Sequence, residues 1–244
     1  MCGRYLLVSP AEAIRRWFGI LGTLPNFPPR YNVAPTDTMP VVRLNVALER
    51  ELVLIRWGLV PGWADSLSVG SRMINARSET VATKGAFRES FIRRRCLVPA
   101  DGYYEWKVVD GQRQPYLIRP PADTLLVFAG IWEVWTRPQA LENGSMRDVG
   151  PAEQLIETYS IITGPALPSI VNTHDRMPIV LEPEGFETWL DPNAAREDLD
   201  LLMAPNHVDF TVTAVGSSVN SVKSDDPNCL EPGSAIQLDQ PSLF

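Results

Sequence analysis

Short runs of alternating apolar and polar residues, rich in β-branched and aromatic side chains, recur along most of the chain and predict strands. The runs at 38–44 and 51–57 predict a strand pair, because a polar stretch separates them. Asp110-Gly111 is typical of a tight hairpin turn between two further runs. The predicted strands cover residues 3–8, 38–44, 51–57, 96–98, 103–109, 115–118, 125–135, 157–163 and 210–215.

Helical periodicity is confined to short segments. Ser9 as N-cap, followed by Pro10, predicts a helix over 11–18, and Gly19 predicts its end. Further helices are predicted at 85–94, 184–190 and 193–203, an ordered proline-rich loop at 25–35, and a surface insertion at 137–152. Together these patterns predict the α+β class: one β-rich domain with a curved or barrel-like mixed sheet and a few peripheral helices.

The composition is that of a folded protein. Of the 244 residues, 45% are hydrophobic and 21% charged, which excludes intrinsic disorder as the main state. No apolar run approaches the roughly 18 residues of a membrane helix and no signal peptide opens the chain, so we expect a soluble cytoplasmic protein. The net charge of −7 hides a basic N-terminal half, because residues 1–119 hold 17 basic and 10 acidic side chains. A polyanion therefore stays a candidate partner.

The cysteines and histidines do not form a metal-binding or disulfide pattern. Cys2, Cys96 and Cys229 are an odd number without close spacing, and the two histidines, His174 and His207, lie far apart. We therefore expect no metal and no cofactor. His207 is interpreted as structural.

Cys2 is the most informative position for chemistry. Removal of Met1 would leave an α-amine and a thiol on one residue, a 1,2-aminothiol that can condense with an aldehyde to an imine and then close a five-membered thiazolidine. The competing interpretation is a small buried residue in an N-terminal strand.

Three other polar positions stand out, each with a structural alternative. Asn75 could hold an amine or carbonyl, or it could cap a helix. Glu105 lies among aromatic residues that would raise its pKa toward acid-base use, or it could be an exposed strand residue paired with Lys107. His174 could exchange protons near pH 7 in a polar cleft, or it could be a satisfied structural donor.

A mixture of cations and aromatic side chains in the chain fits contact with a single nucleic-acid strand, since cations follow phosphates and aromatic rings stack on bases. The same residue types also fill ordinary surfaces and cores. The residues concerned are Arg4, Arg30, Arg77, Arg176, Trp57 and Trp63.

Six motifs in order along the chain resemble the SRAP family, whose name stands for SOS response-associated peptidase. They are Met-Cys-Gly-Arg at the start, Arg-Tyr-Asn-Val-Ala-Pro at 30–35, Trp-Gly-Leu-Val-Pro-Gly-Trp at 57–63, Ile-Asn-Ala-Arg-Ser-Glu-Thr at 74–80, Asp-Gly-Tyr-Tyr-Glu-Trp at 101–106 and His-Asp-Arg-Met-Pro at 174–178. The resemblance implies an SRAP domain over 1–235 with a short tail at 236–244. It also implies a sensor of abasic sites in single-stranded DNA that crosslinks itself to the lesion.

The resemblance assigns roles to individual residues. Processed Cys2 would attack the ring-opened sugar aldehyde through its amine and close a thiazolidine with its sulfur. Asn75 would position the amine, Glu105 would act as acid and base, and His174 matches the family's active-site histidine.

The resemblance also implies a DNA-contacting set. Arg4, Arg77 and Arg176 would hold phosphates, and Pro35 and Trp63 would wedge or stack against bases. Two departures from the family pattern limit this set: residues 219–227 are assigned no DNA contact, and Ala64 stands where some relatives carry a second aromatic residue.

The last five residues, Gln240-Pro241-Ser242-Leu243-Phe244, are similar to short peptides that dock on the bacterial sliding clamp, and they would bring the protein to the nucleoid at replication forks. The alternative is a frayed apolar terminus.

Two other functions stay open for the whole chain. One is an N-terminal-nucleophile peptidase or amidase, in which Cys2 cleaves an amide with its own α-amine as base and Asn75 in the oxyanion hole. The other is a non-catalytic module that binds single-stranded DNA.

Overall fold

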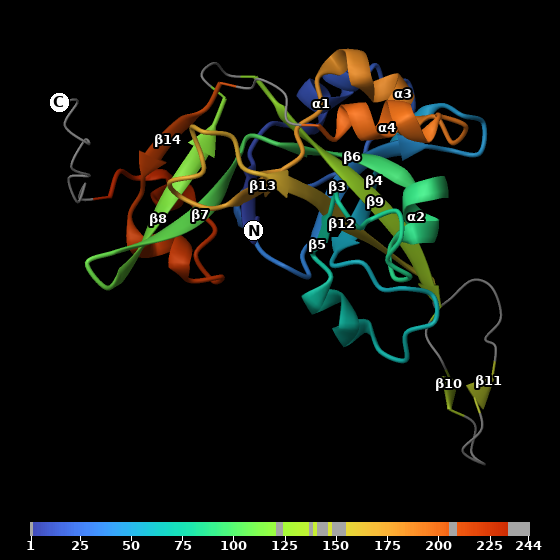
Figure 1. Ribbon diagram of the computed structural model, residues 1–244, viewed down its shortest axis with the longest axis horizontal. Helices are drawn as coiled ribbons and strands as arrows, with labels where there is room; N and C mark the ends of the chain where they lie inside the picture. Colours follow the sequence, from blue (N-terminus) through green and yellow to red (C-terminus); the bar gives the residue numbers. More distant parts are fainter. Residues whose placement is uncertain are drawn as a thin grey trace.

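The computed structural model describes residues 2–120, 124–136, 139–140, 146–147, 155–204 and 209–233. Two sheets organise this part of the chain (Figure 1). The first sheet has the order β14 (Thr211–Ala214), β8 (Gln112–Arg119), β7 (Gly102–Val109), β1 (Arg4–Leu7) and β2 (Arg30–Val33). Its neighbouring strands all pair in antiparallel fashion.

The second sheet closes on itself. Its order is β13 (Arg176–Pro178), β12 (Leu155–Pro165), β4 (Arg50–Trp57), β3 (Thr38–Leu44), β6 (Arg95–Ala100) and β9 (Leu126–Thr136). Because β9 also pairs with β12, five of these strands form a closed barrel. β12 runs parallel to β4 and to the short β5 (Asn75–Arg77), so the sheet is mixed. The predicted β-rich fold with a barrel-like mixed sheet is confirmed.

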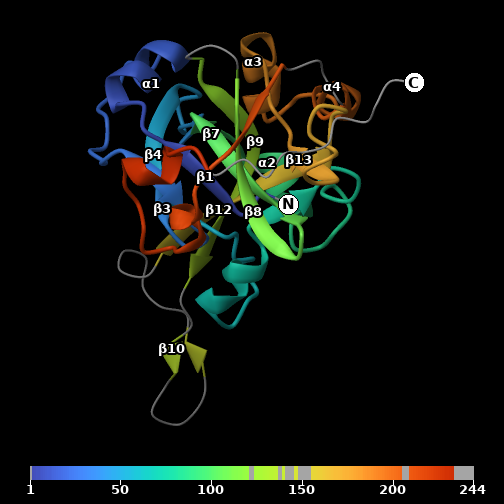
Figure 2. The ribbon, with the colours of Figure 1, turned by 90° about the vertical axis from the view of Figure 1, so that its left-hand side faces the viewer.

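The helices are short and peripheral. They are α1 (Ala11–Phe18), α2 (Arg88–Arg93), α3 (Phe186–Leu190) and α4 (Arg196–Leu202), with 3-10 turns at Leu67–Arg72, Pro183–Gly185, Ser217–Asn220 and Pro227–Leu230. α1, α3 and α4 lie together above the sheets, and the two-residue strands β10 (Gln139–Ala140) and β11 (Met146–Arg147) project from the opposite side (Figure 2). In the described part of the chain, no helix combines the length and apolar character needed to cross a membrane.

Some predicted boundaries were wrong. The N-cap of α1 is Pro10 rather than Ser9, because Pro10 is the last extended residue before the helix. β2 lies inside the segment predicted as a loop, because residues 30–33 contain no proline and so keep the backbone N–H groups that pair with β1. α2 begins three residues later than predicted and α4 also begins three later. The hairpin at Asp110 and Gly111 is confirmed, and both residues have positive φ.

An aromatic core joins the two sheets. Tyr5 of β1 packs edge-on against Trp57 of β4 at a centroid distance of 5.2 Å, and its hydroxyl lies 2.7 Å from that of Tyr159 on β12. Trp57 is fully buried in this core. The prediction that Trp57 stacks on bases was therefore wrong, because its ring is covered by protein.

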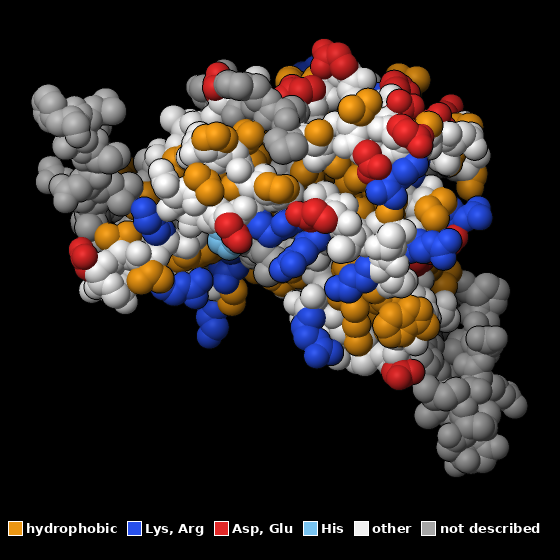
Figure 3. All heavy atoms as spheres, in the orientation of Figure 1, with side chains coloured by type: hydrophobic (Ala, Val, Ile, Leu, Met, Phe, Trp, Pro, Cys, Tyr) orange, Lys and Arg blue, Asp and Glu red, His pale blue; other side chains and the backbone are white. Residues whose placement is uncertain are grey.

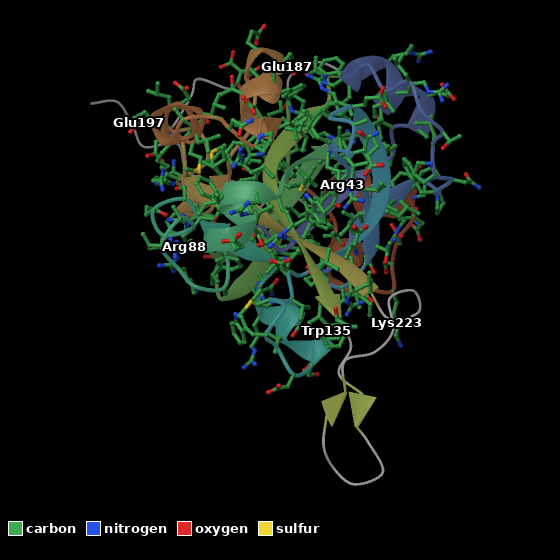
Figure 4. The ribbon with its side chains drawn as sticks, turned by 90° about the vertical axis from the view of Figure 1, so that its right-hand side faces the viewer. Arg43, Arg88, Trp135, Glu187, Glu197 and Lys223 are labelled. Atoms are coloured by element: carbon green, nitrogen blue, oxygen red, sulfur yellow. The ribbon has the colours of Figure 1, made fainter. Side chains whose placement is uncertain are left out.

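Arg43 on β3 ties three barrel strands together (Figure 4). Its guanidinium donates to Glu51 on β4 at 2.7 Å and to Glu157 on β12 at 2.6 Å. It also lies 4.2 Å from the ring centroid of Trp132 on β9. Arg43 thus contacts side chains of three other barrel strands, β4, β12 and β9.

The turn after β4 positions β5. Gly58 has φ of +112° and a Cβ there would lie 2.5 Å from the carbonyl oxygen of Gly70, so only glycine fits. This close approach brings the chain back, and the Leu59 N–H donates to the Met73 carbonyl at 3.2 Å. Asn75 follows directly on β5.

Candidate functional site

A cleft of about 800 Å³ opens beside the start of β1 and the β7–β8 hairpin. It brings together four of the predicted site residues: Arg4, Pro35, Glu105 and His174. The remaining lining residues are Gly3, Trp106, Val108, Arg113 and Asn220. Basic side chains gather over the middle and lower part of the face in Figure 3, whereas acidic ones gather near α3 and α4.

Cys2 lies next to the cleft but points into the core. Its side chain is fully buried, and its Sγ is 3.7 Å from the Arg4 carbonyl oxygen. Burial raises the pKa of the Cys2 thiol far above its ordinary value, and the charge of Glu105 adds to the rise. The sulfur is therefore a neutral thiol near pH 7. The prediction of a small buried residue near the N-terminus and the prediction of a reactive one are both compatible with this position.

Asn75 holds the backbone of Cys2. Its Nδ2 donates to the Cys2 carbonyl at 2.7 Å, and its Oδ1 is buried without a hydrogen-bond partner among the described residues. β5 carries it alongside Ile161 of β12. The helix-cap alternative for Asn75 is wrong, because the residue lies in a strand.

Glu105 is buried among aromatic residues, with 3% of its surface exposed. In the antiparallel pairing of β1 with β7, Arg4 lies opposite Tyr104. Extending this register by one residue places Gly3 opposite Glu105. Burial raises the pKa of the Glu105 carboxyl, and the electrostatic interaction with nearby His174 opposes the rise. The alternative of an exposed glutamate paired with Lys107 is wrong.

His174 lines the cleft between two polar neighbours. Its Nδ1 accepts from the Arg176 backbone N–H at 3.0 Å and lies 2.8 Å from a carboxylate oxygen of Asp175. Its side chain is about 29% exposed, which leaves it in contact with solvent at the cleft.

Two arginines flank Trp106 in the cleft. Arg4 lies 5.9 Å and Arg113 5.8 Å from its ring centroid, and its Nε1 donates to Asn220 at 2.6 Å. The sequence interpretation missed Trp106, Arg113 and Asn220. The hairpin register at Asp110-Gly111 was the available signal, since it places Arg113 opposite Val108.

Arg4 is anchored to the C-terminal segment. Its Nη1 donates to Asn32 Oδ1 at 3.0 Å and to the Val219 carbonyl at 3.1 Å. Asn32 is fully buried and donates in turn to carbonyls of that segment. Arg30, predicted as a nucleic-acid cation, is instead bound by Asp37 and Asp225.

Arg77 lies outside the cleft, at a second hollow of about 520 Å³ that it shares with Asn75. The other residues at this hollow are Thr80, Thr83, Lys84 and Phe87. Arg77 is exposed, in agreement with a solvated or phosphate-binding cation.

Arg176 and Trp63 are also placed away from the lining of the cleft. Arg176 forms a bidentate ion pair with Glu79 at 2.7 and 2.9 Å, and these hydrogen bonds lower the pKa of Glu79 to about 2. Trp63 is 68% exposed on the loop after β4. The next residue, Ala64, packs with Trp135 and accepts a hydrogen bond from its Nε1 at 2.7 Å (Figure 4).

The cysteines are all free and buried. Within the described ranges, no group of three or more His, Cys, Asp or Glu side chains could hold a metal ion.

Comparison with known proteins identifies the family of the chain. Residues 1–222 match the family model described as SOS response associated peptidase (SRAP). The chain belongs to the SRAP family. It is 35% identical over 236 residues to the abasic site processing protein YoqW of Bacillus subtilis strain 168, covering 95% of this chain and 99% of that protein. The abasic site processing protein HMCES of Gallus gallus is 33% identical over 236 residues, covering 84% of this chain and 66% of that protein.

Solved structures show the same fold. A protein of Bacteroides thetaiotaomicron superposes with a TM-score of 0.78 at 24% identity, covering 95% of this chain and all of that one. A phage-related protein of Bordetella bronchiseptica gives 0.64 at 29% identity, covering 88% and 94%. Three predictions for this SRAP protein concern residues outside the described ranges. They are the removal of Met1, the structural role of His207 and the tail at 236–244.

Proposed function

We propose that this SRAP protein processes abasic sites in single-stranded DNA by crosslinking itself to them through Cys2 once Met1 is removed. The observation that carries the proposal is the meeting of Cys2, Asn75 and Glu105 beside a cleft lined with arginines. The names of its relatives as abasic site processing proteins support the substrate.

The protonation states set the order of steps. The buried Cys2 sulfur is a neutral thiol, so the α-amine attacks the aldehyde carbon of the opened sugar first. The carbinolamine then loses water to give an imine. Glu105, whose raised pKa keeps a proton available, donates it to the departing hydroxyl.

Ring closure completes the adduct. The Cys2 sulfur bonds to the imine carbon, the π electrons move to nitrogen, and the nitrogen takes up a proton as the thiol loses one. Asn75 keeps the nucleophile in place through its bond to the Cys2 carbonyl, and its buried Oδ1 is an acceptor for the freed α-amine. His174 exchanges protons when the deoxyribose ring opens.

The strand would pass through the cleft and on toward the Arg77 hollow. Arg4 and Arg113 would supply phosphate contacts in the cleft, and Arg77 with Lys84 would supply them at the second hollow. Pro35 lines the cleft as a wedge and exposed Trp63 is a stacking surface. Arg176 would bind phosphate by sharing its guanidinium with Glu79.

Intact mass spectrometry tests the proposal directly. The purified protein is weighed before and after incubation with an oligonucleotide that carries one abasic site. We expect a starting mass without Met1 and a heat-stable addition of one oligonucleotide on the Cys2 peptide. Adduct formation by Cys2→Ala would overturn the mechanism.

Two further results would favour the other functions. Turnover of an amide substrate without DNA would indicate the peptidase. Equal binding of intact and abasic strands, with no adduct and no loss in Cys2→Ser, would indicate a simple binding module.

We also propose that the tail, Gln240 to Phe244, docks on the sliding clamp and brings the protein to replication forks in the nucleoid. Pulldown with purified clamp, with and without these five residues, is the test. Equal recovery of both forms would reject the docking.

A further inference from the structure

One buried hydroxyl near the site has no use in the steps above. Tyr103 is fully buried, and its Oη has no hydrogen-bond partner among the described residues. Buried polar groups are almost always paired, and an unpaired one in a folded protein calls for a specific explanation such as a role in chemistry.

The strand register relates Tyr103 to Glu105 and to the start of β1. Tyr103 lies two residues before Glu105 on β7, so both side chains leave the same face of the sheet. It pairs with Tyr5 of β1, three residues after Cys2. The rings of Tyr103 and Tyr5 both pack edge-on against Phe128, at 6.0 and 6.2 Å, and Cys2 belongs to the same core cluster.

The electrostatics agree with this placement. Burial raises the pKa of the Tyr103 phenol well above its ordinary value, and a negative charge developing on Cys2 or Glu105 would raise it further. Each of these charges is therefore close enough to act on the phenol. A phenol with a raised pKa keeps its proton and can only donate to an anion beside it.

We propose that Tyr103 is a positioning residue for the Cys2 sulfur, donating its O–H to Sγ as the thiazolidine closes. The proposal rests on the crosslinking function above. In that step the S–H proton leaves, the sulfur pair forms the bond to the imine carbon, and the imine nitrogen gains a proton. The sulfur carries its greatest negative charge while this happens, and the Tyr103 hydroxyl would meet it without taking up or losing a proton.

Tyr104 provides a matched control on the same strand. It is also fully buried, but it leaves the opposite face, where its hydroxyl donates to the Tyr31 carbonyl at 2.8 Å. Its cluster contains Cys229 rather than Cys2. The same loss of one oxygen atom can therefore be made in the core cluster that contains Cys2 or in the one that does not.

The test compares Tyr103→Phe and Tyr104→Phe with the unaltered protein, all lacking Met1, on an abasic oligonucleotide. Borohydride added at successive times reduces the open imine, while the closed ring resists it, so the two steps are measured separately. In Tyr103→Phe we expect imine formation within about twofold of normal and ring closure slower by at least about tenfold, as for loss of one hydrogen bond to a charged group. Tyr104→Phe should close the ring at the normal rate.

Stability provides the second readout. Tyr103→Phe removes an unpaired buried oxygen, so its unfolding midpoint should be unchanged or higher, whereas Tyr104→Phe breaks a bond and should lower the midpoint. An unchanged balance of imine and ring in Tyr103→Phe, or equal slowing of both steps, would overturn the role of Tyr103. Absence of any adduct in the unaltered protein would instead reject the proposed function.

Discussion

Replacing Asn32 with alanine should loosen the wall of the cleft that carries Arg4 and Asn220. Asn32 is fully buried on β2, and its Nδ2 donates to the Ser221 and Ser224 carbonyls at 2.9 and 2.7 Å. Its Oδ1 accepts from the Arg4 guanidinium at 3.0 Å. One amide thus joins β1, β2 and the C-terminal segment.

The cost follows from these three bonds. Two neutral hydrogen bonds contribute about 1 kcal/mol each and the one to a cation about 1.5–3 kcal/mol. Asn32→Ala should therefore lower the free energy of unfolding by about 3.5–5 kcal/mol. Asn228 is exposed on the same segment, so Asn228→Ala should change stability by less than about 0.5 kcal/mol.

Urea unfolding of both variants measures this difference, and binding of an undamaged single strand measures its effect on the cleft. In Asn32→Ala, Arg4 loses a partner, so binding should weaken and depend less steeply on salt. A loss of stability below about 1 kcal/mol in Asn32→Ala would refute the reasoning. It would mean that the bonds of Asp225 to the Tyr31 and Asn32 backbones hold the segment alone.

Three further predictions concern the site itself. Glu105→Gln keeps the shape of the buried side chain but removes its transferable proton. The crosslinking rate measured by gel shift should therefore fall by about 10²-fold or more. An equal rate in both forms would show that Glu105 does not act as the acid. The rate of the unaltered protein should also fall as pH rises through the raised pKa of Glu105, and this limb should vanish in Glu105→Gln. Cys2→Ala should form no adduct yet keep salt-dependent DNA binding, because the phosphate contacts come from other residues. The Arg176–Glu79 ion pair should stabilise the fold above about pH 4.5, and this stabilisation should be lost as pH falls toward 2. Because Glu79 is half exposed, the pair should contribute less than about 1 kcal/mol to the free energy of unfolding. Acid unfolding of Glu79→Gln should lack this loss of stability.

Local patterns were sufficient for most of the fold. β3 and β4 follow from their alternation and from the polar turn between them, and the β7–β8 hairpin follows from Asp110-Gly111, whose positive φ values few other residue pairs accept. β2 could not be predicted in this way. Its strand character comes from pairing with β1, a long-range contact that the flanking prolines hide.

In the site, too, local sequence predicted some features, whereas others depend on long-range contacts. Glu105 could be predicted as a desolvated carboxyl because its aromatic neighbours are adjacent in sequence. The burial of Trp57 and the pairing of Arg176 with Glu79, 97 residues away, depend on how the sheets meet, so sequence could not show that these two side chains are already occupied. Arg113 was missed for a related reason, since only the hairpin register brings it to Trp106.

Under the proposed function, the burial of Cys2 would limit its reaction with aldehydes other than the abasic site. An exposed 1,2-aminothiol would react with any small aldehyde, whereas here the sulfur lies in the core as a neutral thiol. Ring closure then needs an imine already seated beside Glu105, in a cleft whose arginines favour an anionic strand. The fold would thus favour aldehydes that arrive on DNA over those that arrive free in solution. Incubation with a small aldehyde at equal concentration should therefore produce far less ring-closed product than the abasic oligonucleotide, and equal yields would contradict this argument.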